Sequence, residues 1–366
     1  MNRLVYVSPV PWDSFSQRPH KFAEWFHEST QGEVLWLDPY PTRLPRLSDF
    51  THRPQSSSLP RARAPWLTVV SPRALPMEPI PVLQLLNRYL WKNIQKQVVS
   101  FCSGGDALLV AGKPSELALV LLKDRAIRES VYDAMDDFPS FYQGVSKWAM
   151  RQREQVLATK VDHILTSSTV LLERLRSLNR VSLCMNACDL RSLPRVADLQ
   201  PRPRKKLLGY VGTLGPWLDW KLVLKLAACP EVRIRLIGPL FSPPSMVLPD
   251  NIELLPQCTH EQAILAMQTF DVGLIPFKKT ELTSSVDPIK FYEYRALGLP
   301  VLSTSFGEMQ SHRQQPGVFI VDELQSLGDI SFAIDQALAF TSPPDEIERF
   351  RAENSWNSRF DSTHLL

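Results

Sequence analysis

The residues with the clearest potential for chemistry lie between Ser284 and Ser305, in the stretch SSVDPIKFYEYRALGLPVLSTS. Asp287 followed by Pro288 is typical of a helix start, because the carboxylate can accept from first-turn amides and proline suits the first helical position. Glu293 then lies one turn inside this helix, together with Lys290. A helix N-terminus attracts phosphate through its free amides and its positive dipole end. A carboxylate one turn further on could accept both hydroxyls of a ribose attached to that phosphate.

The same stretch also fits a purely structural role. An ordinary amphipathic helix with a solvated glutamate and lysine would show the same pattern. Gly298 is typical of a helix end, and the short, apolar and β-branched run 300–304 suits a buried strand. Either interpretation therefore predicts a helix that leads into a parallel strand.

Three acids, Asp133, Asp136 and Asp137, follow the strand expected at 130–132. Their mutual repulsion disfavours burial of all three, so we expect at least one to face a wet cleft or to have a raised pKa. Such a carboxylate could take the proton from an attacking hydroxyl, which makes Asp136 and Asp137 the candidate catalytic bases. Asp136 is favoured because it is nearer the strand end. A capping aspartate with turn acids before Pro139 is the alternative interpretation.

Two loops are expected at the carboxyl ends of strands, where ligands bind in open parallel sheets. The first follows the strand expected at 4–7 and contains Trp12, Asp13 and Arg18, which we expect to face a cleft. Packing inside the domain is the alternative for Trp12. The second loop follows the strand at 207–211 and reads GTLG, with Thr213 and Gly215. A glycine-rich turn lets the backbone approach a diphosphate, although the same turn also occurs without a ligand in doubly wound folds.

Composition restricts the class of protein. The 366 residues fit two domains of roughly 150 to 200 residues each, and 44% hydrophobic with 22% charged residues is ordinary for a globular protein. A net charge of +3 is too small to indicate nucleic-acid binding. The five cysteines have neither metal-ligand spacing nor a disulfide framework, which fits reduced thiols in the cytoplasm. We find no signal pattern and no apolar run near the roughly 20 residues that cross a bilayer, so we expect neither export nor membrane insertion.

Proline and arginine mark two irregular segments. Residues 41–79 lose their periodicity, and Asp49 alone opposes the arginines up to Arg63. This segment is either a loosely packed basic insertion or a surface attracted to anionic lipid. Residues 191–206 contain three prolines and a cluster of arginine and lysine, which indicates a linker. Strands that alternate with helices on both sides of the linker predict two doubly wound parallel-sheet α/β domains, at 1–190 and 207–345.

The stretch around Glu293 resembles the nucleotide-sugar-binding helix of GT-B glycosyltransferases of the family 4 type, written DP-x-K-x-x-E-Y-x-A-x-G-x-P-V. The likeness is greatest to bacterial enzymes that build extracellular polysaccharide and teichuronic-acid-type polymers. In that family the glutamate at this position holds the nucleotide ribose. A second glutamate eight positions earlier contacts the donor sugar in many relatives, whereas this chain has Ser285 there. Glu281 or Asp287 would have to substitute for it.

Other segments are similar to further parts of this family. The GTLG turn resembles its G-x-L turn, and Gly238 with Pro239 resembles a loop beside the donor base. The Trp-Asp and Arg-Pro pairs in the first loop, and the Asp-Asp-Phe at Asp136, match its acceptor side. In the resembling fold the last segment, here 346–366, crosses back to the first domain.

The resemblance implies two Rossmann-like domains that face one another across a cleft. It further implies a glycosyltransferase of the hexosyltransferase type that acts in bacterial polysaccharide synthesis. The enzyme would move a sugar from a nucleotide-sugar donor to a lipid-linked saccharide acceptor. We expect no metal and no cofactor, because helix amides, Gly215 and Lys290 could stabilise the leaving diphosphate. We expect the protein to act in the cytoplasm, at the inner face of an anionic membrane. A nucleotide-sugar epimerase of the same fold and a catalytically silent binding subunit, which the loss of a glutamate at Ser285 allows, remain alternatives.

Overall fold

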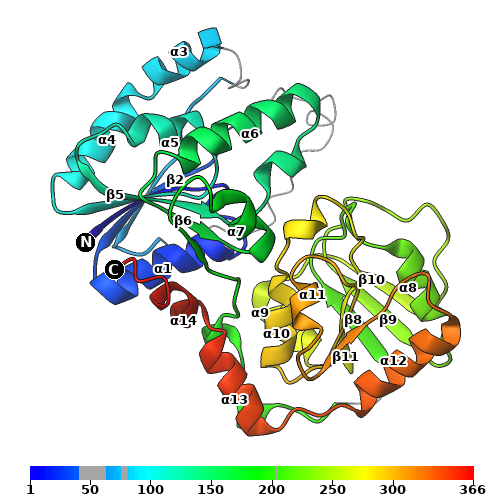
Figure 1. Ribbon diagram of the computed structural model, residues 1–366. Coiled ribbons are helices and arrows are strands. Elements are labelled where there is room, and N and C mark those ends of the chain that lie inside the picture. The colour runs from blue at the N-terminus through cyan, green and yellow to red at the C-terminus, as the bar shows by residue number, and fades with distance from the viewer. Residues whose placement is uncertain (41–62, 76–80, 203–204) are drawn as a thin grey trace. The chain divides into compact units, whose positions relative to one another are not determined.

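The computed structural model describes residues 1–40, 63–75, 81–202 and 205–366. It divides into two compact units, Met1–Cys184 with Phe360–Leu366 (unit 1) and Met185–Arg359 (unit 2), shown in Figure 1. The sequence placed the first boundary at 190 and the returning segment at 346. The boundary lies earlier because the Asn186 amide nitrogen already donates to Asp287 of unit 2, at 2.7 Å. The chain returns later, at Phe360, because helix α13 (Pro344–Glu353) packs on α10 (Ile289–Ala296) inside unit 2.

Unit 1 is built on a seven-stranded sheet in which all six strand pairs are parallel, in the order β3-β2-β1-β4-β5-β6-β7. Its strands are β1 (Arg3–Val7), β2 (Glu33–Leu37), β3 (Leu67–Val70), β4 (Ala107–Ala111), β5 (Ile127–Ala134), β6 (His163–Thr166) and β7 (Val181–Leu183). Its helices are α1 (Arg18–Thr30), α3 (Pro81–Leu90), α4 (Lys92–Cys102), α5 (Glu116–Leu121), α6 (Gly144–Ala158) and α7 (Thr169–Leu175). The short apolar runs predicted as strands are buried on both faces, as parallel sheets require.

Strand β3 was missed in the sequence, where the whole segment 41–79 was taken as irregular. Leu67–Val70 contains three apolar residues, two of them β-branched, and pairs with β2 alone, at the edge of the sheet. Because an edge strand needs only one partner, four residues among prolines and arginines are enough to form it. The arginines of this segment up to Arg61 lie outside the described residues.

Unit 2 has a six-stranded sheet, again with every pair parallel, in the order β10-β9-β8-β11-β12-β13. Its strands are β8 (Leu207–Val211), β9 (Arg233–Ile237), β10 (Ile252–Leu255), β11 (Val272–Ile275), β12 (Val301–Ser303) and β13 (Val318–Ile320). The order reverses between β8 and β11, so the loops after these two strands flank the crevice where ligands bind in such sheets.

Helices cover both faces of the unit 2 sheet, and a separate apolar cluster fills each interface. Helices α8 (Trp220–Ala227) and α12 (Leu327–Ala339) supply one cluster, and α9 (His260–Met267) and α10 supply the other. A short helix α11 (Met309–His312) follows β12. Gly273 allows α10 to pack closely, because a Cβ there would lie 2.3 Å from the ring of Tyr294. The Tyr294 hydroxyl then donates to the carbonyl of Gly209 in β8, at 3.2 Å.

Helix α14 (Trp356–Asp361) carries the chain from unit 2 back to unit 1. There the Trp25 indole donates to Asp361 at 2.7 Å, and Phe360 packs edge-on against Phe22. The two parallel-sheet α/β domains predicted from the sequence are confirmed. No helix among the described residues is long and apolar enough to cross a membrane.

The close approach of Gly238 to Gly212 predicts a stability effect. Gly238 has φ of +148°, and a Cβ there would lie 2.0 Å from the Gly212 carbonyl oxygen. Since both groups are backbone, we expect Gly238→Ala to lower the free energy of unfolding by on the order of 2–4 kcal/mol. Chemical denaturation measures this change. Gly328→Ala is the control, because its Cβ meets only Ser326 Oγ at 3.6 Å on a helix, and an equal loss in both variants would contradict the argument.

Candidate functional site

The loops that follow β8 and β11 are joined directly to one another. The Asp219 amide donates to the Pro276 carbonyl at 2.7 Å, and the Lys278 amide donates to the Trp217 carbonyl at 2.7 Å. A further bridge pairs Leu218 with Phe277. The glycine-rich turn is therefore fixed beside the segment that leads into α10, at the switch point of the sheet.

The structure brings the two predicted donor loops together. The Gly212 amide donates to the Ile237 carbonyl, and the Leu214 amide donates to the Pro239 carbonyl, both at 2.9 Å. Thr213 is half-buried in this turn, and its carbonyl accepts from the Tyr210 hydroxyl.

Gly215 is less open than its neighbours in the turn. It is buried under Trp217, whose ring would lie 2.6 Å from a Cβ at this position. The half-buried backbone of Gly212 and Thr213 is thus the more accessible part of the turn.

Glu293 is the centre of the site. Only 5% of the residue is exposed, yet its two carboxylate oxygens contact two more exposed side chains. Oε1 lies 3.1 Å from His260 Nε2, and Oε2 is paired with the Lys290 ammonium. Because each carboxylate oxygen can accept more than one hydrogen bond, this group can still receive donors from a ligand. The N-terminus of α10 thus lies close to a cation, Lys290, and to a carboxylate held in place, Glu293, an arrangement that suits an anionic ligand.

His260 was not singled out from the sequence. It is the first residue of α9, and Thr259 and Gln262 form a capping box around it. The Thr-His-Glu-Gln sequence, which three residues separate from the end of β10, was the available signal. It predicts a helix start at the carboxyl edge of the sheet, and therefore a histidine on the ligand-binding side.

Asp287 does not cap α10, so the predicted helix start is wrong in this respect. The residue that precedes the helix is Pro288, and no side chain of the described residues is seen to cap the first turn. The Asp287 side chain is instead fully buried. It accepts from the Tyr292 hydroxyl at 3.0 Å and the Asn186 amide at 2.7 Å, and Oδ1 lies 3.4 Å from His312 Nε2. A carboxylate removed from water needs such partners, so Asp287 positions α10 from inside the unit.

Ser285 lies on the short 3₁₀ turn Thr283–Ser285 ahead of α10. It is 2% exposed, and its hydroxyl has no hydrogen-bond partner among the described residues. Asp287 cannot replace the absent glutamate at this position, because its carboxylate is committed elsewhere.

Arg18 does not face a cleft, which corrects the sequence prediction. It is 1% exposed, and its guanidinium binds the buried carboxylate of Asp133 through Nε at 2.9 Å and Nη2 at 2.8 Å. Nη1 donates to the Cys184 carbonyl at 2.7 Å. Once Asp133 is buried at the end of β5, a paired arginine is what offsets its desolvation.

Trp12 is also a packing residue, so the expectation that it faces a cleft is wrong. It is 4% exposed, its ring lies edge-on to Trp36 at 5.0 Å, and its amide donates to Asp38 at 2.9 Å. Asp13 is half-buried in the same loop.

The structure separates the two candidate bases. Asp137 is paired with Arg174 at 2.5 Å and accepts from Ser140, at 2.5 Å. Asp136 is half-buried, and its carboxyl has no hydrogen bond or ion pair within the described part of the chain. Burial raises the pKa of Asp136 to about 7, with Arg18 opposing the shift and the carboxylates of Asp133 and Asp137 adding to it. Asp136 is therefore the carboxyl that can exchange a proton near neutral pH.

Solved structures match the whole chain. Sucrose-phosphate synthase from Thermosynechococcus elongatus superposes with a TM-score of 0.66 and 17% identity, over 100% of this chain and 98% of its own. HepE of Anabaena, solved in complex with UDP-glucose, gives 0.64 and 13%, over 99% of each chain. The UDP-forming α,α-trehalose-phosphate synthase from Burkholderia vietnamiensis gives 0.58 and 12%, over 99% and 96%. All three are GT-B glycosyltransferases. The chain has the GT-B fold.

Comparison of sequences finds a match over a shorter part of this chain. No family model matches it. A curated protein of Bacillus subtilis (strain 168), named "Putative teichuronic acid biosynthesis glycosyltransferase TuaH", is 28% identical over 120 residues. The match spans 31% of this chain and 30% of that protein.

The raised pKa of Asp136 predicts a pH-dependent gain in stability on its removal. Its pKa is about 7 in the folded state and near its ordinary value of 3.8 in the unfolded state. The free energy of unfolding therefore falls as the pH rises from about 4 to 7, because the unfolded state ionises more easily. We expect Asp136→Asn to raise the free energy of unfolding by on the order of 1–3 kcal/mol above pH 7, with a smaller gain near pH 5. Denaturation at several pH values measures this difference. A gain independent of pH would contradict it.

Proposed function

We propose that this protein is a glycosyltransferase that moves a sugar from a nucleotide-sugar donor to a hydroxyl of a saccharide acceptor. One observation carries the proposal. Glu293 is buried one turn into α10, in contact with His260 and Lys290, in a chain with the GT-B fold. Two similar structures of HepE, solved in complex with UDP-glucose and with UDP, support a nucleotide-sugar donor.

The donor would bind at the switch point of the unit 2 sheet. Glu293 accepts the ribose hydroxyls, and the free amides at the start of α10 and the Lys290 ammonium meet the diphosphate. The same groups stabilise the negative charge that develops on the leaving nucleoside diphosphate, without a metal. Gly212 and Thr213 let the backbone approach the phosphates, and Gly238 with Pro239 lies beside the base.

The acceptor hydroxyl would lose its proton to Asp136 if the reaction inverts the anomeric configuration. Asp136 is suited to this because its carboxyl is uncommitted and its pKa of about 7 balances base strength against ionisation at neutral pH. A retaining reaction would let the leaving phosphate accept the proton instead.

The acceptor we propose is a lipid-linked saccharide of a bacterial surface polysaccharide, at the inner face of the cell membrane. The name of the similar protein of Bacillus subtilis, which refers to teichuronic acid biosynthesis, supports this part of the proposal.

Product analysis tests the reaction. The protein is incubated with a panel of nucleotide sugars, with and without saccharide acceptors, and the products and their anomeric configuration are determined. A glycosyltransferase releases nucleoside diphosphate and forms a glycoside only with acceptor present. Conversion of the donor to an isomeric nucleotide sugar without acceptor would indicate an epimerase, and binding without turnover would indicate a silent subunit.

Removal of the Glu293 carboxylate should weaken donor binding. We expect Glu293→Ala to lose roughly 1.5–3 kcal/mol for each charge-assisted hydrogen bond to the ribose, with the fold intact. Calorimetric titration with UDP-glucose measures the loss. Glu261→Ala is the matched control, because Glu261 is an exposed acid on neighbouring α9. Unchanged affinity of Glu293→Ala would contradict the assignment.

Removal of the Asp136 carboxylate should slow turnover and leave donor binding intact. If Asp136 is the base, Asp136→Asn lowers kcat by roughly 10²–10⁴-fold with little change in donor affinity. Asp137→Asn should lower stability more than turnover, because Asp137 pairs with Arg174. Full turnover of Asp136→Asn would exclude Asp136 as the base.

A further inference from the structure

Helix α3 of unit 1 turns apolar side chains to the outside. Its exposed residues include Leu85 at 65%, Leu86 at 48%, Tyr89 at 67% and Leu90 at 45%. Asn87 is buried instead, and its amide group bonds the backbone of Leu75 at 2.7 and 3.1 Å. A surface helix normally buries its apolar residues, whereas these four are exposed. Such an apolar surface marks a site of interaction.

The charged residues on α3 and α4 all have the same sign. From Pro81 to Ser103 the sequence contains no aspartate or glutamate, but it contains Arg88, Lys92 and Lys96. Lys92 and Lys96 are exposed on α4, directly after α3. The Lys92 ammonium lies 4.7 Å from the ring centre of Tyr89, so cationic and apolar groups are interleaved.

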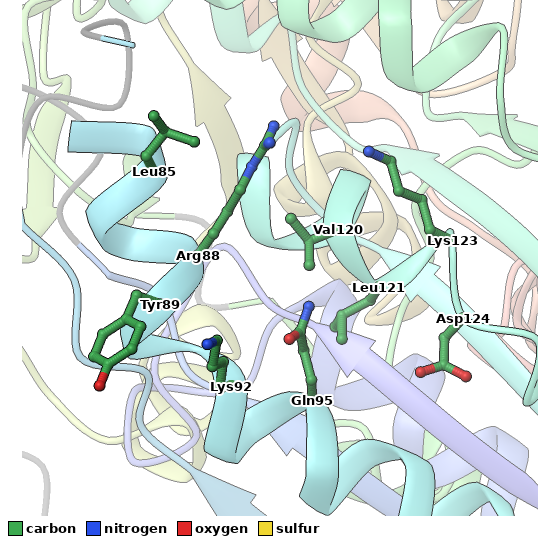
Figure 2. Close-up of a pocket in the computed structure, with 9 residues that line it drawn as sticks. All are labelled: Leu85, Arg88, Tyr89, Lys92, Gln95, Val120, Leu121, Lys123 and Asp124. Carbon is green, nitrogen blue, oxygen red and sulfur yellow. The ribbon is translucent and has the colours of Figure 1, made fainter. Parts of the chain in front are cut away.

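A groove of about 630 Å³ runs beside this surface, between α3 and α4 on one side and α5 on the other (Figure 2). Arg88, Lys92 and Lys123 line it together with Leu85 and Tyr89, and Asp124 is the acid at its far side. Arg88 reaches across to α5 and pairs with Glu116 at 2.5 Å. The two lysines of the groove, Lys92 and Lys123, have no ion pair among the described residues. The groove thus combines positive charge with an apolar margin.

We propose that the α3–α4 surface, residues 84–100 with Lys123, binds an anionic lipid membrane. Leu85, Leu86, Tyr89 and Leu90 would enter the boundary between head groups and acyl chains, as the apolar face of an interfacial helix does. Lys92, Lys96 and Lys123 would contact lipid phosphates, whose negative surface potential attracts such residues.

Charge favours an anionic membrane over a second copy of this chain as the partner of the α3–α4 surface. In a symmetric dimer through this surface, the positively charged surface of one copy would face the same positively charged surface of the other. An anionic bilayer offers the opposite charge and an apolar interior at once.

Membrane binding through this surface goes beyond the proposed reaction and does not depend on it. Its consequence for catalysis, access to a lipid-linked acceptor, does rest on the proposed function. Binding is therefore measured on the full chain without substrates, so that its failure and the failure of the transferase assignment are separate results.

Vesicle sedimentation tests the proposal. We expect the parent protein to sediment with phosphatidylglycerol-containing vesicles at low salt, to remain soluble with phosphatidylcholine vesicles, and to be released as salt screens the lysines. Lys92→Glu with Lys96→Glu should weaken binding by about tenfold or more. Leu85→Ser with Leu86→Ser should weaken it in low salt as well. All four side chains are exposed, and circular dichroism and thermal melting check that the variants fold.

Two matched controls locate the effect. Lys160→Glu reverses an exposed lysine after α6, and Phe332→Ser removes a side chain that is 66% exposed on α12 of unit 2. Both should bind vesicles like the parent. Equal binding by the α3–α4 variants and the parent, or no binding by the parent at low salt, would overturn the proposal. A loss of self-association in these variants without any vesicle binding would assign the surface to a second copy.

Discussion

The buried carboxylate of Asp287 is the constraint on which the unit 2 site depends. A charge removed from water must be hydrogen-bonded, and Tyr292, Asn186 and His312 surround it. These contacts tie the first residues of unit 2 to the start of α10. Since Glu293 follows one turn later, its carboxylate is held at a defined place beside the loops from β8 and β11. The proposed donor site is thus positioned from inside the unit.

The sequence predicted the helix that carries Lys290 and Glu293, because these residues lie close together in the chain. Lys290 and Glu293 lie one turn apart, so their relative placement follows from helix geometry. The role of Asp287 was misjudged, because its partner Asn186 lies 101 residues away in the chain. Arg18 and Trp12 were misjudged because their surroundings come from far away: Arg18 pairs with Asp133, 115 residues on, and Trp12 packs against Trp36. His260 was missed for the same reason, since its contact with Glu293 joins two helices 33 residues apart.

Unit 1 shows how burial assigns different roles to similar residues. Asp133, Asp136 and Asp137 looked alike in sequence, yet Arg18 pairs with Asp133 and Arg174 pairs with Asp137. Asp136 is left without a pair among the described residues, and burial beside two carboxylates raises its pKa. A buried carboxyl without a partner lowers stability, and proteins retain such destabilising residues where function needs them. The exposed leucines of α3 likewise suggest a functional surface.

Recognition of ribose by Glu293 is the central claim, and a binding cycle tests it most directly. The affinities of a nucleoside diphosphate and of its 2′,3′-dideoxy analogue are measured by calorimetry for the parent protein and for Glu293→Ala. If Glu293 accepts the ribose hydroxyls, the parent should bind the analogue on the order of tenfold to a hundredfold more weakly, and the variant should bind both alike. An equal preference for the ribose in both proteins would contradict the account.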